Sequence, residues 1–277
     1  MSLEWEAYAK PVKEIDLPSG RTQCWLLSDG RGPSIVDLVF ADVDPDELAA
    51  ARGLEPEAPD GPYNCLLVRG EDAVVLVDTG LGAAEHPLGG EGGRLWGELA
   101  RVGTDPADID LVVISHGHLD HIGGLVRGGE PAFPRARYLI SDGEWEYWTS
   151  PTVLDGLSEL VAAPPREQLP PLEAAGVLET FTGELQVAAD IRLIPAPGHT
   201  PAHVAVEVGA ARGFLYTVDA FLHPLQYGHP AWGRGMDLAA DTAVATRHAL
   251  LELASEREHA IGASHWDVVL GPPPQGR

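Results

Sequence analysis

Residues 115–124, which read SHGHLDHIGG, constrain this chain more than any other stretch. Within six residues they hold three histidines and one aspartate: His116, His118, Asp120 and His121. Imidazole and carboxylate groups are ligands of the kind that bind Zn²⁺ and similar divalent ions. The apolar run directly before them, residues 111–114, predicts a buried strand. The pattern therefore predicts that four polar side chains leave a strand end together, in one tight loop held by a rigid scaffold.

The spacing within this loop predicts two ions rather than one. Alternate residues of an extended segment share a face, so His116 and His118 point the same way and can bind one ion. Asp120 and His121 follow a turn of the chain and can face a second ion. An open catalytic ion usually takes three protein ligands and water, and four ligands from one segment exceed that need. The alternatives are a histidine-rich surface loop and a single structural zinc, and the preceding strand disfavours both.

The His-x-His-x-Asp-His motif after an apolar strand resembles the signature of the metallo-β-lactamase superfamily. The resemblance covers roughly residues 64–270, where the pattern of an apolar strand with a ligand at its end recurs. It implies seven metal ligands: His116, His118, Asp120, His121, His199, Asp219 and His265. In such a set His199 joins the first ion, Asp219 bridges both ions, and His265 joins the second.

The same resemblance implies an α/β (α+β) fold, the αββα sandwich, in which two mixed β-sheets face each other with helices outside. We expect one metallo-β-lactamase-like domain over residues 1–277. Within it, residues 1–62 are expected to be a peripheral N-terminal segment. Residues 141–180 are expected to be a helical insert that serves as a lid or pocket wall.

Local patterns predict several elements around this framework. The apolar run at residues 35–40 indicates a short strand. Residues 45–52 indicate a short helix with Asp44 as its N-cap. Residues 151–176 are typical of a helical region, with interruptions at the proline pairs 164–165 and 170–171.

Three further polar residues are expected to lie outside the ligand set. Asp78 ends the second strand of a hairpin predicted over residues 64–77. In the resembled superfamily an Asp-Thr-Gly at this point is a structural element, so we expect Asp78 to support a ligand rather than bind an ion. His203 is expected to have a supporting or structural role. His86, in a glycine-rich loop, is expected to be solvent-exposed.

The composition and charge of the chain limit the classes of partner that it is expected to bind. With 42 acidic against 18 basic residues the formal charge is −24, which disfavours nucleic-acid and anionic-lipid surfaces. No apolar run reaches the roughly 18 residues of a membrane span, and the N-terminus has no apolar signal core. Cys24 and Cys65 form no metal-type or redox-type pair and are expected to be buried free thiols. We therefore expect a cytoplasmic protein with a small-molecule substrate and no nucleic-acid or membrane partner, and a homodimer is compatible with this reading.

The function that follows is a binuclear metal-dependent hydrolase. Two ions roughly 3.5 to 4 Å apart can bridge a hydroxide and clamp the substrate oxygen of an ester, lactone or related acyl group. The expected ions are Zn²⁺, with Mn²⁺, Fe²⁺ or Co²⁺ as alternatives. The alternative functions are a phosphotriester (organophosphate) hydrolase and a mononuclear-iron oxygenase resembling persulfide dioxygenases.

Three residues are candidates for catalysis. Asp120 is expected to hold its ion and to orient the nucleophile. His223 or Tyr227 is expected to donate a proton to the leaving group, and the alternative is that both only pack the loop. Several lactonases of the resembled superfamily carry a tyrosine three residues after the bridging aspartate, and here that position is Leu222.

Overall fold

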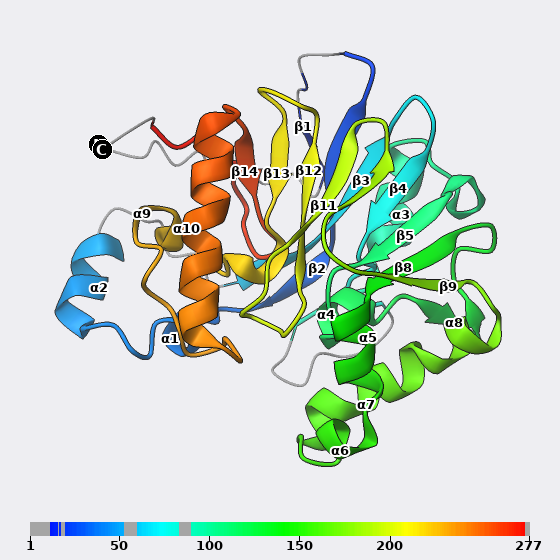
Figure 1. Cartoon of the computed structure of the whole chain (residues 1–277), viewed down its shortest axis with the longest axis horizontal. Helices are drawn as coiled ribbons and strands as arrows, with labels where there is room; N and C mark the ends of the chain where they lie inside the picture. Colours follow the sequence, from blue (N-terminus) through cyan, green and yellow to red (C-terminus); the bar gives the residue numbers. More distant parts are fainter. Residues whose placement is uncertain (1–11, 16, 18–19, 53–59, 83–89, 275–277) are drawn as a thin grey trace.

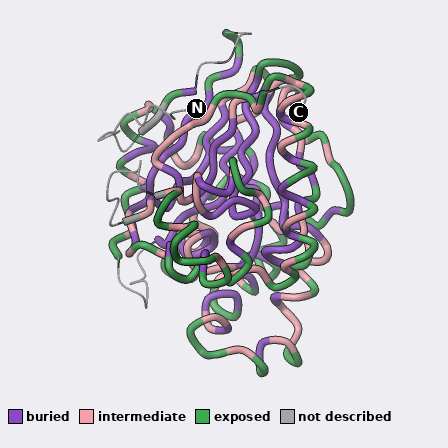
Figure 2. Tube along the Cα trace, turned by 90° about the vertical axis from the view of Figure 1, so that its left-hand side faces the viewer, coloured by how far each residue is buried: buried purple, intermediate pink, exposed green. Residues whose placement is uncertain are grey.

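The computed structural model describes residues 12–15, 17, 20–52, 60–82 and 90–274. Two β-sheets face each other at the centre, and helices cover their outer faces (Figure 1). This arrangement confirms the predicted αββα sandwich. Figure 2 shows that buried residues gather in the central strands, whereas the surrounding helices and loops are largely half-buried or exposed. None of the helices in the described ranges has both the length and the apolar character needed to span a bilayer.

The larger sheet has seven strands in the order β1-β2-β3-β4-β5-β8-β9. Strands β1 to β4 are antiparallel, and β4, β5, β8 and β9 are parallel to one another. Their bounds are β1 Val12–Ile15, β2 Gln23–Pro33, β3 Asp60–Arg69, β4 Val74–Val77, β5 Leu111–Ile114, β8 Arg137–Ser141 and β9 Leu178–Phe181.

The smaller sheet has five strands in the order β10-β11-β12-β13-β14, antiparallel except for the parallel pair β13 and β14. Its bounds are β10 Leu185–Ala188, β11 Ile191–Pro195, β12 Val204–Val208, β13 Phe214–Tyr216 and β14 Ala260–Gly262. A separate two-stranded ribbon joins β6 (Val126–Arg127) to β7 (Glu130–Pro131).

Side chains alternate between the two faces of each sheet. The result is one apolar layer between the sheets and one further apolar layer on the outer face of each sheet, under the helices. In β3, Leu66 and Val68 face the layer between the sheets, and Cys65 and Leu67 face the outer helices. Because successive side chains of a strand point to opposite faces, a strand that is apolar throughout can fill two layers. Both cysteines, Cys24 and Cys65, are free and buried, as predicted.

The helices lie outside the sheets. On the seven-stranded sheet pack α3 (Leu95–Arg101), α5 (Asp142–Thr149) and α7 (Glu159–Gln168), and on the five-stranded sheet packs α10 (Ala240–Glu256). The shorter helices are α1 Val36–Val39, α2 Pro45–Arg52, α4 Leu119–Ile122, α6 Pro151–Leu154, α8 Pro170–Ala174 and α9 Leu225–Gly228. Two 3₁₀ turns are η1 Pro106–Asp108 and η2 Val218–Ala220.

Two local predictions were wrong. The run at residues 35–40 contains the short helix α1 (Val36–Val39) rather than a strand. Its apolar residues Val36, Val39 and Phe40 lie at helical spacing and pack together in one cluster. Pro164 and Pro165 do not interrupt a helix, because α7 runs through both and buries their rings, which offsets the lost backbone hydrogen bonds. The interruption predicted at the second proline pair, residues 170–171, is confirmed, because α7 ends at Gln168 and α8 begins at Pro170.

The N-terminal segment is less peripheral than expected. Strand β2, within residues 1–62, pairs with β1 on one side and β3 on the other, so it is an inner strand of the larger sheet. Its apolar residues Trp25, Leu26 and Leu27 are buried in the core. The helix predicted at residues 45–52 is α2, and the Asp44 carboxylate accepts hydrogen bonds from the backbone of Asp46 and Glu47, as an N-cap does.

Candidate metal centre

The predicted ligands converge because each leaves the end of a strand at one edge of the two sheets. His116 and His118 follow β5, and α4 carries Asp120 and His121. The remaining three come from the smaller sheet: His199 follows β11, Asp219 lies in η2 after β13, and His265 follows β14. Parallel and facing strands end together, so residues far apart in sequence meet there.

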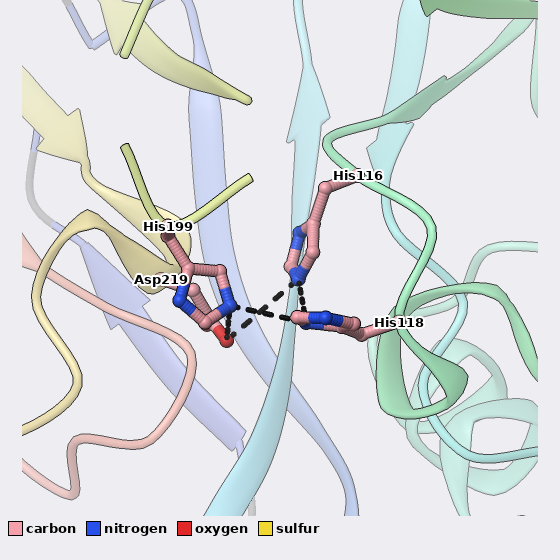
Figure 3. A group of neighbouring side chains, drawn as sticks. All are labelled: His116, His118, His199 and Asp219. Atoms are coloured by element: carbon pink, nitrogen blue, oxygen red, sulfur yellow. Dashed lines mark hydrogen bonds and ion pairs between the residues drawn. The ribbon is translucent and has the colours of Figure 1, made fainter. Parts of the chain in front are cut away.

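The ligands form two groups, in each of which the candidate ligand atoms lie within 4.8 Å of one another. The first group contains His116, His118, His199 and Asp219 (Figure 3). Nδ1 of His118 is 3.0 Å from Nε2 of both His116 and His199. Ligands at zinc distances of about 2 Å in a tetrahedron lie roughly 3.3 Å apart, so this spacing fits one ion.

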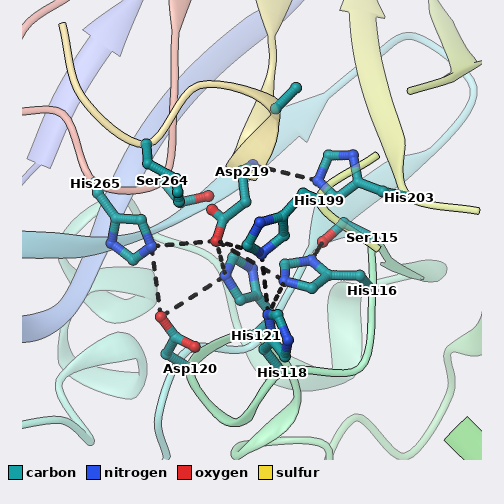
Figure 4. Close-up of polar contacts among 12 residues, drawn as sticks. Ser115, His116, His118, Asp120, His121, His199, His203, Asp219, Ser264 and His265 are labelled. Atoms are coloured by element: carbon teal, nitrogen blue, oxygen red, sulfur yellow. Dashed lines mark hydrogen bonds and ion pairs between the residues drawn. The ribbon is translucent and has the colours of Figure 1, made fainter. Parts of the chain in front are cut away.

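The second group contains Asp120, His121 and His265 (Figure 4). Oδ2 of Asp120 lies 3.5 Å from Nε2 of His265 and 3.8 Å from Nε2 of His121. Oδ2 of Asp219 lies 3.3 Å from Nε2 of both His121 and His265, and 3.5 Å from Nε2 of His199. One oxygen of Asp219 therefore lies close to histidines of both groups, so this carboxylate could contribute to two ions.

Asp78 orients two histidines of the site, as predicted for a supporting residue. Its Oδ2 is 2.8 Å from Nδ1 of His121 and accepts the Ser115 hydroxyl at 2.7 Å. Ser115 Oγ in turn lies 3.0 Å from Nδ1 of His116. Because the Nδ1 side of each ring is engaged in this network, Nε2 of both histidines is free to face the ligand cluster.

His203 contacts Asp219, the aspartate that is predicted to bridge the two groups. Its Nε2 accepts the backbone N–H of Asp219 at 3.2 Å, and its ring is fully buried. Val218, one residue before Asp219, has φ of 51°, and Asp78 has φ of 63°. Both are non-glycine residues in the left-handed region, where backbone strain is held by the surrounding structure and clusters at functional sites.

A buried pair on α5, not predicted from the sequence, braces the first group. The Glu144 carboxylate accepts the Trp148 indole N–H at 2.6 Å and the backbone N–H of Ala202 at 2.8 Å. The Trp148 ring lies edge-on to His118, with centroids 5.3 Å apart. A side chain at Gly117 would come within 2.4 Å of that indole. The spacing of Glu144 and Trp148, one helical turn apart, is the only sequence signal of this contact.

The charge environment differs between the two groups. Burial and the neighbouring histidines His121, His118 and His199 lower the pKa of His116 well below its usual value. Burial and the neighbouring His199 lower the pKa of His118 to about 3. Burial also opposes protonation of His121, but Asp219, Asp120 and Asp78 outweigh it and raise the pKa of this histidine. Burial thus keeps the imidazoles of His116 and His118 neutral, which suits cation binding, whereas three carboxylates surround His121.

His223 and Tyr227, the two candidate proton donors, lie in the segment after the bridging aspartate. Nδ1 of His223 accepts the backbone N–H of Leu225 at 3.2 Å, and its ring packs edge-on to Phe40. The Tyr227 hydroxyl donates to the carbonyl of Gly271 at 3.0 Å. Neither joins the two ligand groups. His86 lies outside the described residues.

Comparisons with known proteins identify the family to which the chain is similar. The profile of the metallo-beta-lactamase superfamily matches residues 58–265. An N-acyl homoserine lactonase from Bacillus sp is 28% identical over 184 residues, which cover 59% of this chain and 66% of that protein. A metallo-beta-lactamase domain-containing protein 1 from Mus musculus is 42% identical over 95 residues, 33% of this chain and 30% of that one.

Two solved structures share the fold at low identity. The dizinc quorum-quenching lactonase AidC has a TM-score of 0.78 at 24% identity, covering 96% of this chain and 98% of its own. The hydrolase AbOPH has a TM-score of 0.81 at 20% identity, covering 98% and 100%. The match to the Bacillus sp lactonase spans slightly less than two thirds of that relative's length. Because the superfamily profile covers more than half of the chain, the protein belongs to the metallo-beta-lactamase superfamily.

Proposed function

We propose that the protein is a binuclear metal-dependent hydrolase that opens a lactone or cleaves a related ester. The observation that carries this proposal is the pair of ligand groups joined by one oxygen of Asp219. The neutral imidazoles of His116 and His118 and the carboxylates of Asp120 and Asp219 converge at this point, and such donors suit a bound divalent cation. When bound, two divalent ions supply a nucleophilic hydroxide near neutral pH and polarise the substrate carbonyl.

The proposed ions are Zn²⁺. The ligand set combines five imidazoles with two carboxylates and has no thiolate, a mixture that zinc accepts in catalytic sites. Mn²⁺, Fe²⁺ and Co²⁺ tolerate the same donors, so metal analysis has to distinguish them. His116, His118 and His199 hold the first ion in this proposal, Asp120, His121 and His265 hold the second, and Asp219 contacts both.

The chain's own residues then have separate tasks. Asp120, whose side chain is 15% exposed, is the most accessible ligand of its group, which supports a role in orienting the nucleophile. His223 is the better supported of the two proton donors. Its Nδ1 accepts a backbone N–H, so the proton of the neutral ring resides on Nε2. The Tyr227 hydroxyl, by contrast, is already engaged with the carbonyl of Gly271.

The proposed substrate class is a lactone, because several curated relatives are named N-acyl homoserine lactonases. Leu222 stands where several lactonases of the superfamily carry a tyrosine, so contacts to the substrate differ at that position. Phosphotriester hydrolysis is the competing activity within the same site. The charge of −24 does not decide between them, because bound ions dominate the local field.

The experiment is metal analysis of protein purified without chelator, run beside a panel of lactones, aryl esters and a phosphotriester. We expect two ions per chain and turnover of a lactone that is lost on chelation and restored by Zn²⁺. Two ions with phosphotriester turnover alone would replace the substrate class. One iron per chain without hydrolysis would overturn the proposal in favour of oxidative chemistry.

A further inference from the structure

A second buried carboxylate, Asp237, stands behind the first ligand group. It lies in the segment before α10, and its side chain is 0% exposed. Its Oδ1 lies 3.5 Å from Nδ1 of His199, on the side of the ring opposite to the ligand cluster. Among the described residues neither atom has a hydrogen-bond partner, so each is left for the other.

The counter-charge of Asp237 is Arg247, which comes from the inner face of α10. Nη1 of Arg247 lies 3.0 Å from Oδ2 of Asp237, and both side chains are fully buried. A buried ion pair is costly to desolvate and is weak evidence of stabilisation by itself. Its geometry is more informative, because the guanidinium occupies one carboxylate oxygen and leaves the other facing His199.

Arg247 also contacts two segments that carry the site. Its Nε donates to the carbonyl of Pro230 at 2.7 Å, and Nη1 lies 3.4 Å from the carbonyl of Ala220. Ala220 directly follows the bridging Asp219. The Arg247 guanidinium therefore contacts Ala220, the loop before α10 and the Asp237 carboxylate at the same time.

Backbone hydrogen bonds also fix the segment that carries Asp237 against the segment that carries His199. The N–H of Leu238 donates to the carbonyl of His199 at 3.1 Å, and the N–H of Ala239 donates to the carbonyl of Gly198 at 2.8 Å. Gly198 has φ of 132°, and a Cβ there would come within 2.3 Å of the Ala243 backbone. Asp237 therefore cannot drift from His199 without disrupting the start of α10.

We propose that Asp237, fixed by Arg247, is the positioning residue of the first metal ion: it accepts the Nδ1 proton of His199 and so presents Nε2 as the ligand. This inference rests on the proposed binuclear site. A carboxylate behind a metal-binding histidine fixes the tautomer and ring orientation and raises ligand basicity. Asp78 does the same for His121 in the second group, so each ion has one histidine backed by an aspartate.

The test is Zn²⁺ affinity by chelator competition in the wild type and in Asp237→Asn, with ¹⁵N-histidine NMR of the imidazoles. We expect Asp237→Asn to weaken one of the two ions about 10- to 100-fold. In NMR the hydrogen-bonded Nδ1 proton of zinc-loaded His199 should be present in the wild type and lost in the variant. Asp78→Asn should instead affect the resonances of His121.

Asp241→Asn is the matched control. Asp241 belongs to the same part of the chain and pairs with Arg234, but its side chain is 94% exposed and its carboxylate serves no ligand. The Asp241→Asn variant should bind both ions as the wild type does. If Asp237→Asn does not fold because Arg247 is left uncompensated, the double variant Asp237→Asn with Arg247→Met removes both charges and should show the same weakened ion.

The outcomes are distinct. A folded Asp237→Asn variant, or the double variant, that binds both ions with wild-type affinity overturns the positioning role while leaving the hydrolase proposal intact. A wild-type His199 that carries its proton on Nε2 in the zinc-loaded protein also overturns it. A wild type that binds no ion defeats the proposed function itself.

Discussion

The two ligand groups differ in how the chain builds them. The first draws on three separate segments from both sheets, and His116, His199 and Asp219 are at most 3% exposed. The second takes Asp120 and His121 from one short helix, and its outer members are more open, with side-chain exposures of 15% for Asp120 and 9% for His265. A buried, multiply braced group is suited to hold an ion rigidly, whereas an open group is suited to meet a substrate.

The electrostatics follow the same division. The imidazoles His116 and His118 of the first group have lowered pKa values, because burial dominates and other histidines surround them. Burial also disfavours a charged His265, but Asp219 and Asp120 outweigh it and raise its pKa, as three aspartates do for His121. The contrast shows that the nearby carboxylates, rather than burial alone, determine whether the pKa of a histidine in this cluster is lowered or raised.

Removing the shared ligand should have the largest effect. Asp219→Asn keeps the side-chain volume but removes the charge that faces both groups. Affinity for both ions should therefore fall by more than the roughly 100-fold that is lost when a hydrogen-bond partner of a ligand is removed. Metal content after dialysis checks this, with Asp241→Asn as a charge-matched surface control. Wild-type retention of both ions would break the idea of a shared oxygen.

A matched pair of histidine variants should separate the two groups. His199→Ala and His265→Ala each remove one imidazole that follows a strand of the smaller sheet. Each variant should bind one ion less per chain and lose at least about 100-fold in hydrolysis, since both ions stabilise charge in the reaction. Loss of both ions from either single variant would show that the groups are not independent.

Gly117→Ala should disturb the first group through its packing. The added methyl group would lie 2.4 Å from Cγ of Trp148, so the indole over His118 must shift. Overpacking of this kind costs about 1–3 kcal/mol in the free energy of unfolding, measured by urea denaturation. Gly97→Ala is the control, because nothing lies within 4 Å of its Cβ position in α3 and alanine favours helix.

The smallest effect on metal binding should come from a buried cluster outside both groups. Burial would raise the pKa of Glu207, but His259, Arg192 and Arg257 outweigh it and lower that pKa. A depressed carboxyl pKa contributes stability above the ordinary value of 4.5 and loses it as the pH falls through the folded-state value. Glu207→Gln should therefore be less stable by about 1–3 kcal/mol at pH 7.

Thermal unfolding of Glu207→Gln across pH checks this sign. The difference from the wild type should shrink as the pH falls below about 4.5, where the unfolded carboxyl is already protonated. Both ions should bind normally at pH 7. A stability difference that persists unchanged at acid pH would contradict the assigned role of the charge.

Much of the fold could be predicted because it depends on residue patterns within single short segments of the chain. The hairpin of β3 and β4, the apolar strand β5 and the Asp44 cap of α2 follow from side-chain period and capping chemistry. Helix α1 could not, because its short apolar run satisfies both strand and helix patterns. Its docking against Leu222 and Leu225, far along the chain, selects the helix.

By itself the sequence predicted which residues are candidate ligands, since imidazoles and carboxylates at strand ends favour metal binding, and the resemblance to one superfamily completed the set. Only the tertiary structure decided that one Asp219 oxygen faces both groups, that Trp148 lies over His118 and that Asp237 backs His199. The physical reason is that a ligand is recognised by its own chemistry, which the sequence states directly. Its supporting partners are defined by distances across the fold, which no local pattern encodes.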